Sequence, residues 1–341
     1  MKTDDFDYHL PEELIAQTPM EPRDHSRLMV LDRASGAIEH RRFYDLPGYL
    51  RPGDVLVFND SRVIPARLHA RRTGGGGSVE LLLLRREGPG RWHSLVKPGR
   101  RMRQGDAFEV SRDGRRIAGE VVAVHEDGSR TVELSGEEHL DALGVVPLPP
   151  YIHEPLADPE RYQTVYARAQ GSVAAPTAGL HFTQGLLDQI RSRGVETVFV
   201  TLHVGLGTFR PVTVDDPESH KMHPEYWELT SDAAEAIGKA KTQGRRVISV
   251  GTTAVRLMEQ AASQVPDGQL SRGSGWADIF IYPGHRFRLV DALVTNFHLP
   301  KSTLLMLTSA LAGRERLLAA YQEAASLGYR FYSFGDAMLV V

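Results

Sequence analysis

Residues 54–134 hold a succession of short apolar stretches, and no segment with helical periodicity of useful length lies between them. Turn-rich breaks separate the stretches, among them the four glycines at 74–77 and the Asp127-Gly128 pair. Strands joined by short turns pair with their neighbours in the chain, so this pattern predicts a small β-barrel or sandwich. The expected strands cover residues 54–58, 63–71, 79–85, 91–96, 117–124 and 130–134.

The proline-rich segment at 146–150 ends this module, because proline lacks the backbone donor that a helix or an interior strand needs. Helical and apolar stretches alternate after it, which predicts an α/β layer. The expected helices cover 183–193, 231–244, 302–312 and 315–327, with another that begins at 251–253, and the expected strands cover 195–204, 247–250, 277–282, 290–295 and 337–341. Because the first 50 residues also look mixed, we expect a discontinuous α/β catalytic domain of residues 1–53 and 148–341, with an inserted β-barrel domain of residues 54–147.

Composition removes several classes of function. The 341 residues include no Cys, which excludes disulfides, thiolate zinc sites, iron–sulfur clusters and a cysteine nucleophile. The sequence has no apolar run of about 18 residues, and its acidic start lacks the apolar region of a signal peptide, so a soluble, cytoplasmic protein is expected. Neither a Gly-x-Ser-x-Gly elbow nor a phosphate-binding Gly-x-x-x-x-Gly-Lys loop occurs.

Charge is distributed unevenly along the chain. The net charge is only −3, yet residues 62–116 contain 14 Lys or Arg against 5 Asp or Glu. Nearly all of these cations are Arg, whose planar fork donates paired hydrogen bonds to phosphate. The excess predicts a surface that faces a polyanion, and a solvated surface with a general Arg bias is the alternative.

Four polar segments stand at the ends of expected strands or helices, where α/β folds bind ligands: 174–182, 202–209, 250–256 and 291–303. In the first, small residues allow a ligand to approach the backbone, and His181 titrates near neutral pH. A hydrogen-bonded structural histidine explains that segment equally well. The second lacks the third glycine and the following helix of a dinucleotide fingerprint, so a Rossmann site is excluded, but the loop is suited to holding an adenosine or ribose.

Two other patterns also have plain alternatives. Thr252 and Thr253 stand at an expected helix start, where free backbone N–H groups favour an anion, although an ordinary N-cap explains them as well. His220, His223 and Glu225 resemble part of a metal site. The proline after His223 disfavours a continuing helix and no third ligand is evident, so no metal is expected.

Taken together, these segments resemble the S-adenosylmethionine:tRNA ribosyltransferase-isomerase family of queuosine biosynthesis, nearly from end to end. The first runs that carry the resemblance are DFDYHLPEELIAQ at 5–17, NDSRVIPARL at 59–68, YQTVYA at 162–167 and AAPTAGLHF at 174–182. The others are the glycine loop that follows His203 and the segments 220–225, 251–256, 282–284, 295–303 and 335–338.

The resemblance implies an enzyme that transfers and isomerises the ribosyl moiety of S-adenosylmethionine onto 7-aminomethyl-7-deazaguanine at the wobble position of tRNA. The products would be epoxyqueuosine-tRNA, adenine and methionine. Such a reaction needs a base for the C5′ proton, an acid for the departing adenine and an unprotonated amine. S-adenosylmethionine is then a co-substrate, and no cofactor is expected.

We expect His181, His203 and His298 to surround one cleft and at least one of them to move a proton, because imidazole titrates near working pH. The helix start at Thr252 and Thr253, together with Arg256, is the candidate site for the methionine carboxylate. The other expected substrate-binding residues are Asn59, Arg62, Pro176, Thr177, Gly179, Gly205, Gly207, Thr208, Asn296 and Ser302.

The basic module would then face the tRNA anticodon arm, whose loop bases can leave the stack and enter a pocket. Its expected tRNA-binding residues are Arg71, Arg72, Arg100, Arg101 and Arg103. We expect a monomer or a weak homodimer with no membrane partner. Two alternatives stay open: an S-adenosylmethionine-dependent RNA methyltransferase, and a non-catalytic RNA-binding protein.

Overall fold

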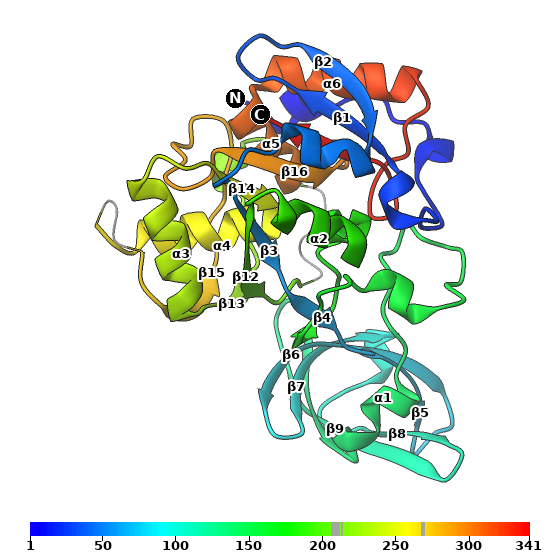
Figure 1. The fold of residues 1–341 in the computed structure, drawn as a ribbon. Helices are drawn as coiled ribbons and strands as arrows, with labels where there is room; N and C mark the ends of the chain where they lie inside the picture. The colour runs from blue at the N-terminus through cyan, green and yellow to red at the C-terminus, as the bar shows by residue number, and fades with distance from the viewer. Residues whose placement is uncertain (206–211, 213, 267–269) are drawn as a thin grey trace. The chain divides into compact units, whose positions relative to one another are not determined.

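The computed structural model describes residues 1–205, 212, 214–266 and 270–341, drawn as a coloured ribbon in Figure 1. The chain divides into two compact units. The larger unit consists of Met1–Ser61, Pro150–Arg168 and Pro176–Val341, and the smaller one of Arg62–Pro149 and Ala169–Ala175. The predicted fold class, an α/β domain that carries an inserted β-barrel, is confirmed.

A nine-stranded sheet in the order β15-β13-β12-β3-β14-β16-β17-β1-β2 forms the larger unit. Four adjacent strands in the middle, β12, β3, β14 and β16, run parallel. Every residue of β3, β14 and β16 is buried, as expected for parallel strands with both faces covered. The bounds are β1 Arg27–Leu31, β2 Ile38–Arg42, β3 Val55–Asn59, β12 Glu196–Leu202, β13 Glu225–Leu229, β14 Val247–Val250, β15 Gly273–Ala277, β16 Ala292–Asn296 and β17 Ala337–Val340.

The helices of the larger unit agree with the predicted segments. Thr183 and Ser302 accept hydrogen bonds at the N-termini of α2 and α5, as N-caps do, and Thr230 caps α3 one residue before the predicted start. Among the residues that the structure describes, no helix is long and apolar enough to cross a bilayer. The bounds are α2 Gln184–Ser192, α3 Ser231–Thr242, α4 Thr252–Ser263, α5 Thr303–Ala312 and α6 Arg314–Ser326.

Several 3₁₀ turns supplement these helices. One of them, η8, begins immediately after the inserted unit and carries His181. Its residues pack into the same core as β3, α2 and η4. The bounds are η1 Thr3–Phe6, η2 Glu12–Leu14, η3 Arg23–His25, η4 Phe43–Tyr49, η5 Gly99–Arg101, η6 Glu137–His139, η7 Pro159–Tyr162, η8 Thr177–His181 and η10 Pro217–Ser219.

The smaller unit is a closed antiparallel barrel in the order β10-β7-β6-β5-β8-β9. Strand β4 pairs separately with β11, and the short helix α1 follows β10. The bounds are β4 Ser61–Val63, β5 Arg67–Arg72, β6 Ser78–Gly88, β7 Arg91–Lys97, β8 Ala107–Arg112, β9 Arg115–Val124, β10 Arg130–Ser135, α1 Leu140–Leu143 and β11 Ala169–Ser172.

The strand expected at 54–58 does not belong to the barrel. It is β3, and it lies between β12 and β14 in the larger sheet. An uninterrupted apolar run is typical of a central parallel strand, whereas barrel strands alternate between apolar and polar residues. The inserted unit therefore starts at Arg62 and ends at Pro149, with the return segment Ala169–Ala175 added, instead of covering 54–147.

Several strands differ from the sequence prediction, and β11 is among those that were not predicted. β8 was missed, although Asp113 and Gly114, both with positive φ, form the two-residue turn of a β-hairpin with β9. β13 was missed as well. The strand expected at 277–282 lies earlier, as β15, where the absence of side chains at Gly273 and Gly275 leaves room for the Trp227 ring.

Candidate active site

The carboxyl ends of the four parallel strands lie at one edge of the sheet, because neighbouring parallel strands end on the same side. His203 follows β12, Asp60 follows β3 and Gly251 follows β14. Asn296 is the last residue of β16. This edge is where open α/β sheets bind ligands.

His181 is held by hydrogen bonds at both ring nitrogens. Its Nδ1 lies 2.8 Å from Ser26 Oγ and its Nε2 lies 3.1 Å from Asn296 Nδ2. Asn296 Nδ2 also donates to the Tyr332 carbonyl at 3.2 Å, which fixes the orientation of the amide. His181 Nε2 therefore accepts, and Nδ1 carries the proton and donates to Ser26. The ring stacks on Phe43 at 4.9 Å between centroids, and burial lowers the pKa of His181 to about 4, so the imidazole is neutral at pH 7.

Asn296 joins η8 to the end of β16. Its Oδ1 accepts a hydrogen bond from Thr177 Oγ1 at 3.2 Å. Tyr332, whose carbonyl accepts from the same amide, has a φ of 70°, a conformation that is costly for a residue other than glycine. A strained backbone thus holds Asn296, and Asn296 in turn holds His181 and Thr177 in a fixed relation.

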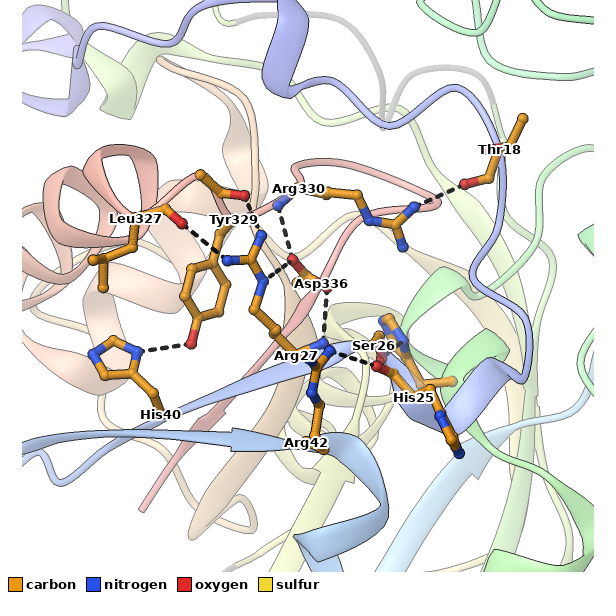
Figure 2. A network of polar contacts seen from close by, with 12 residues as sticks. Thr18, His25, Ser26, Arg27, His40, Arg42, Leu327, Tyr329, Arg330 and Asp336 are labelled. Atoms are coloured by element: carbon orange, nitrogen blue, oxygen red, sulfur yellow. Dashed lines mark hydrogen bonds and ion pairs between the residues drawn. The ribbon is translucent and has the colours of Figure 1, made fainter.

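The buried carboxylate of Asp336 stabilises the segment that carries Ser26, the hydrogen-bond partner of His181. Asp336, which is 1% exposed, accepts hydrogen bonds from the backbone N–H of Arg27 at 2.8 Å, from Arg27 Nε at 3.1 Å and from the backbone N–H of Arg330 at 2.9 Å (Figure 2). Ser26, the partner of His181, immediately precedes Arg27 in the chain. The Asp336 carboxylate therefore fixes the backbone that presents Ser26 to the imidazole.

His203 differs from His181 because one of its ring nitrogens has no hydrogen-bond partner among the described residues. Its Nδ1 is buried without a hydrogen-bond partner among the residues that the structure describes. The ring lies nearly parallel to Tyr226, with 6.1 Å between centroids. Burial lowers the pKa of His203, while Asp60 and Glu228 act in the opposite direction. His203 is therefore unprotonated at neutral pH, and its ring as a whole is partly exposed.

His298 is more deeply held. Its Nε2 lies 2.8 Å from Thr295 Oγ1, its backbone N–H donates to Tyr321 at 3.0 Å, and its carbonyl accepts from the Tyr8 hydroxyl. Burial lowers the pKa of His298 to about 3. These contacts hold the residue inside the larger unit, and its catalytic role stays a prediction.

The N-terminus of α4 has no side-chain cap among the described residues. Gly251 occupies the N-cap with a φ of 88° and offers no side chain to the first N–H groups of the helix. Thr253 is 7% exposed, and its Oγ1 has no hydrogen-bond partner among the described residues. A Cβ added at Gly251 would lie 3.6 Å from both Thr253 Oγ1 and Ala178 Cβ, so α4 begins beside η8. This helix start has the donors for an anion and lies near His181.

Arg256 does not have the arrangement expected of a carboxylate-binding residue. Its guanidinium forms a buried ion pair with Glu225, in which both side chains are 3% exposed, and its Nη2 donates to the Ala277 carbonyl at 3.1 Å. Glu225 also accepts from the Gly205 backbone N–H at 2.8 Å. Because Glu225 already neutralises it, Arg256 ties α4 to β13 and to the end of β15.

Two other expected substrate-binding residues have structural partners. Asn59 is fully buried, and its amide bonds both the N–H and the carbonyl of Leu202, which ties β3 to β12. Ser302 caps α5 by accepting from Leu305 and donates to the Leu299 carbonyl at 2.8 Å. Their hydrogen bonds are explained without a ligand.

Two of the remaining expected residues, Pro176 and Gly179, lie at η8. Gly179 allows close packing, since a Cβ there would lie 1.9 Å from the Tyr166 hydroxyl. Pro176 is the N-cap of η8, and Arg62 opens the smaller unit. Gly207 and Thr208 lie outside the described residues.

In the smaller unit, the expected tRNA-binding cations lie on the surface. Arg72 is paired with Asp106 at 2.7 Å, whereas Arg71, Arg100, Arg101 and Arg103 are exposed. In the larger unit, Glu225 is engaged with Arg256 and does not gather with the two histidines of its segment. Within the part of the chain that the structure describes, no three His, Asp or Glu side chains cluster as metal ligands.

Comparison with known proteins gives a consistent result. The family model described as "Queuosine biosynthesis protein" matches residues 3–340. Curated S-adenosylmethionine:tRNA ribosyltransferase-isomerases from Symbiobacterium thermophilum and Desulforamulus reducens are 58% and 54% identical, each over 100% of both chains. The crystal structure of an S-adenosylmethionine tRNA ribosyltransferase from Thermotoga maritima is 38% identical, with a TM-score of 0.57 over 99% of this chain and 100% of that one.

Proposed function

This chain belongs to the queuosine biosynthesis protein family, and from that premise we propose that it is an S-adenosylmethionine:tRNA ribosyltransferase-isomerase. It transfers and isomerises the ribosyl moiety of S-adenosylmethionine onto the aminomethyl group of 7-aminomethyl-7-deazaguanine at the tRNA wobble position. S-adenosylmethionine is consumed as a substrate, and no resident cofactor is required. The reaction takes place in the cytoplasm.

One observation carries the assignment of the site: the hydrogen-bonded chain Thr177–Asn296–His181 lies beside the open start of α4. The free N–H groups of that helix, with the Thr253 hydroxyl, bind the methionine carboxylate. This role replaces the one expected for Arg256, which is already paired with Glu225. Thr177, which is partly exposed, then faces the ribose hydroxyls, while Asn296 holds it in place, because both amide hydrogens of Asn296 are already donated within the protein.

His203 takes the C5′ proton next to the sulfonium. Its lowered pKa keeps the imidazole unprotonated at pH 7, and its ring is partly exposed just after the carboxyl end of β12. His181 is a positioning residue in this scheme, because Ser26 and Asn296 occupy both of its nitrogens.

Product identity tests the function. Purified protein is incubated with labelled S-adenosylmethionine and tRNA that bears the deazaguanine precursor, and the released small molecules are identified. Ribosyl transfer frees adenine and methionine. A methyltransferase would instead release S-adenosylhomocysteine, and a non-catalytic RNA-binding protein would release nothing, so either outcome would contradict the proposal.

Neutralising exposed arginines of the barrel is expected to weaken the salt dependence of tRNA binding. Arg100, Arg101 and Arg103 are changed together to Ser. Each lost phosphate contact lowers the slope of log K against log salt by about 0.7 to 0.9, so three contacts lower it by roughly 2 to 3. Filter binding at several salt concentrations measures the slope. The matched control changes Arg41, Arg51 and Arg191, three exposed arginines of the larger unit, and equal slopes in the two triple variants would remove the barrel assignment.

A further inference from the structure

Three aromatic side chains form a row across the last three strands of the sheet. Tyr226 in β13 lies directly opposite Trp276 in β15, and the backbone N–H of His203, just after β12, donates to the Tyr226 carbonyl at 2.9 Å. The centroid distances are 6.1 Å between His203 and Tyr226 and 5.5 Å between Tyr226 and Trp276. We call His203, Tyr226 and Trp276 the aromatic row.

Among the described residues, the row lies on the more exposed face of β13 and β15. Successive side chains of a strand point to opposite faces, so Tyr226 and its neighbour Trp227 face opposite ways. Trp227 is 2% exposed and packs over Gly273 and Gly275. Trp276 is 44% exposed. The Trp276 ring therefore presents an apolar surface on which a flat partner can stack.

Polar groups of suitable kinds share this face. Glu228 lies two residues after Tyr226, pairs in register with Ser274 and is exposed. Its carboxylate accepts hydrogen bonds from the N–H groups at the edge of a base. Thr201, two residues before His203, donates to Asp60 at 2.7 Å, and Asp60 holds Arg168, whose side chain is 75% exposed. Arg168 thus offers a guanidinium to a phosphate near the row.

We propose that the aromatic row is a stacking platform for an unpaired base of the RNA substrate, an inference that rests on the proposed function. The base stacks on Trp276, its N–H edge faces Glu228 and a neighbouring phosphate meets Arg168. Stacking on aromatic rings is how proteins commonly hold bases that have left a single-stranded loop. Because the row ends at His203, the platform brings the RNA loop to His203, the residue proposed above as the general base.

Intrinsic fluorescence tests the platform directly. Trp92 and Trp227 are 5% and 2% exposed, so Trp276 is the tryptophan that a bound base can reach. An anticodon stem-loop RNA is titrated into the full-length protein. We expect quenching that Trp276→Phe abolishes. Trp276→Ala should bind the RNA roughly 5- to 150-fold more weakly, and Trp276→Phe, which keeps a ring, should lose much less. Leu327→Ala, an exposed apolar residue after α6, is the matched control and should bind as the wild type does.

Three results would overturn the platform: no quenching by RNA, equal RNA affinity in Trp276→Ala and wild type, or quenching by S-adenosylmethionine alone. The Phe variant keeps the test valid if the Ala variant does not fold. Adenine release by the wild type is measured in parallel. If adenine is released but Trp276→Ala binds RNA normally, the platform fails while the proposed function stands; if no adenine is released, the function itself fails.

Discussion

His203→Ala is expected to lower kcat roughly 10²- to 10⁴-fold while leaving the fold intact, because general-base catalysis contributes about that much. The ring is partly exposed, and its Nδ1 makes no hydrogen bond to the described residues, so its removal breaks no hydrogen bond at that atom. Rates of adenine release measure the effect, and the thermal midpoint reports the fold. His9→Ala, an exposed histidine of the same unit, is the matched control. If His203→Ala retained the kcat of the wild type, His203 would be excluded as the general base.

The pH profile gives a second readout for His203. A base must be unprotonated, so kcat falls as the pH drops through the pKa of His203. Burial lowers that pKa below the ordinary 6.5, which places the limb of the profile below pH 6.5. Glu228 raises the pKa, so Glu228→Gln should shift the limb to still lower pH. A limb that is unchanged in His203→Gln would assign the titration to another group.

Glu225→Ala is expected to cost about 3–5 kcal/mol of unfolding free energy, because it leaves the Arg256 guanidinium buried without its counter-charge. For a unit of this size, the loss corresponds to roughly 6–20 °C in thermal midpoint. The Gly205 N–H also loses its acceptor. Calorimetry or chemical denaturation measures the change.

Two controls separate this role from substrate binding. Glu225→Leu combined with Arg256→Met replaces the pair by apolar side chains and should recover most of the lost stability. Asp188→Ala removes the exposed partner of Arg191 and should change stability by less than about 1 kcal/mol. If Arg256→Met raised KM for S-adenosylmethionine with no loss of stability, the carboxylate role expected from the sequence would be restored.

Local patterns predicted the secondary structure of the α/β half well. The helix after Thr183 and the strand at 247–250 were predicted close to their observed bounds, because caps and apolar periodicity depend on residues within one or two turns. β8 was missed although its Asp-Gly turn is visible in the sequence. β15 was misplaced because it contains Gly273 and Gly275, which leave space for the Trp227 ring. Glycine has a low strand propensity, so the sequence pattern did not predict a strand there.

The candidate site was predicted only in part. Thr177, His181 and Asn296 were expected at one site, and they are hydrogen-bonded to one another. Ser26, Asp336 and Tyr332 were not identified, since each acts through a hydrogen bond that spans more than 30 residues. The ion pair of Arg256 with Glu225 was not foreseen for the same reason: Glu225 is 31 residues away and looked like a metal ligand.

The sequence by itself determined the family, the barrel inserted into an α/β domain, and the segments that carry polar side chains, because these follow from long ordered runs and local periodicity. Only the tertiary structure decided which of those side chains are already satisfied by the protein and which remain open to a ligand. Hydrogen bonds and ion pairs between distant segments depend on strand order and helix packing. Strand order and helix packing in turn depend on the whole chain. His181 and His203 were therefore equivalent candidates in the sequence, whereas in the structure they have different hydrogen-bond partners and different proposed roles.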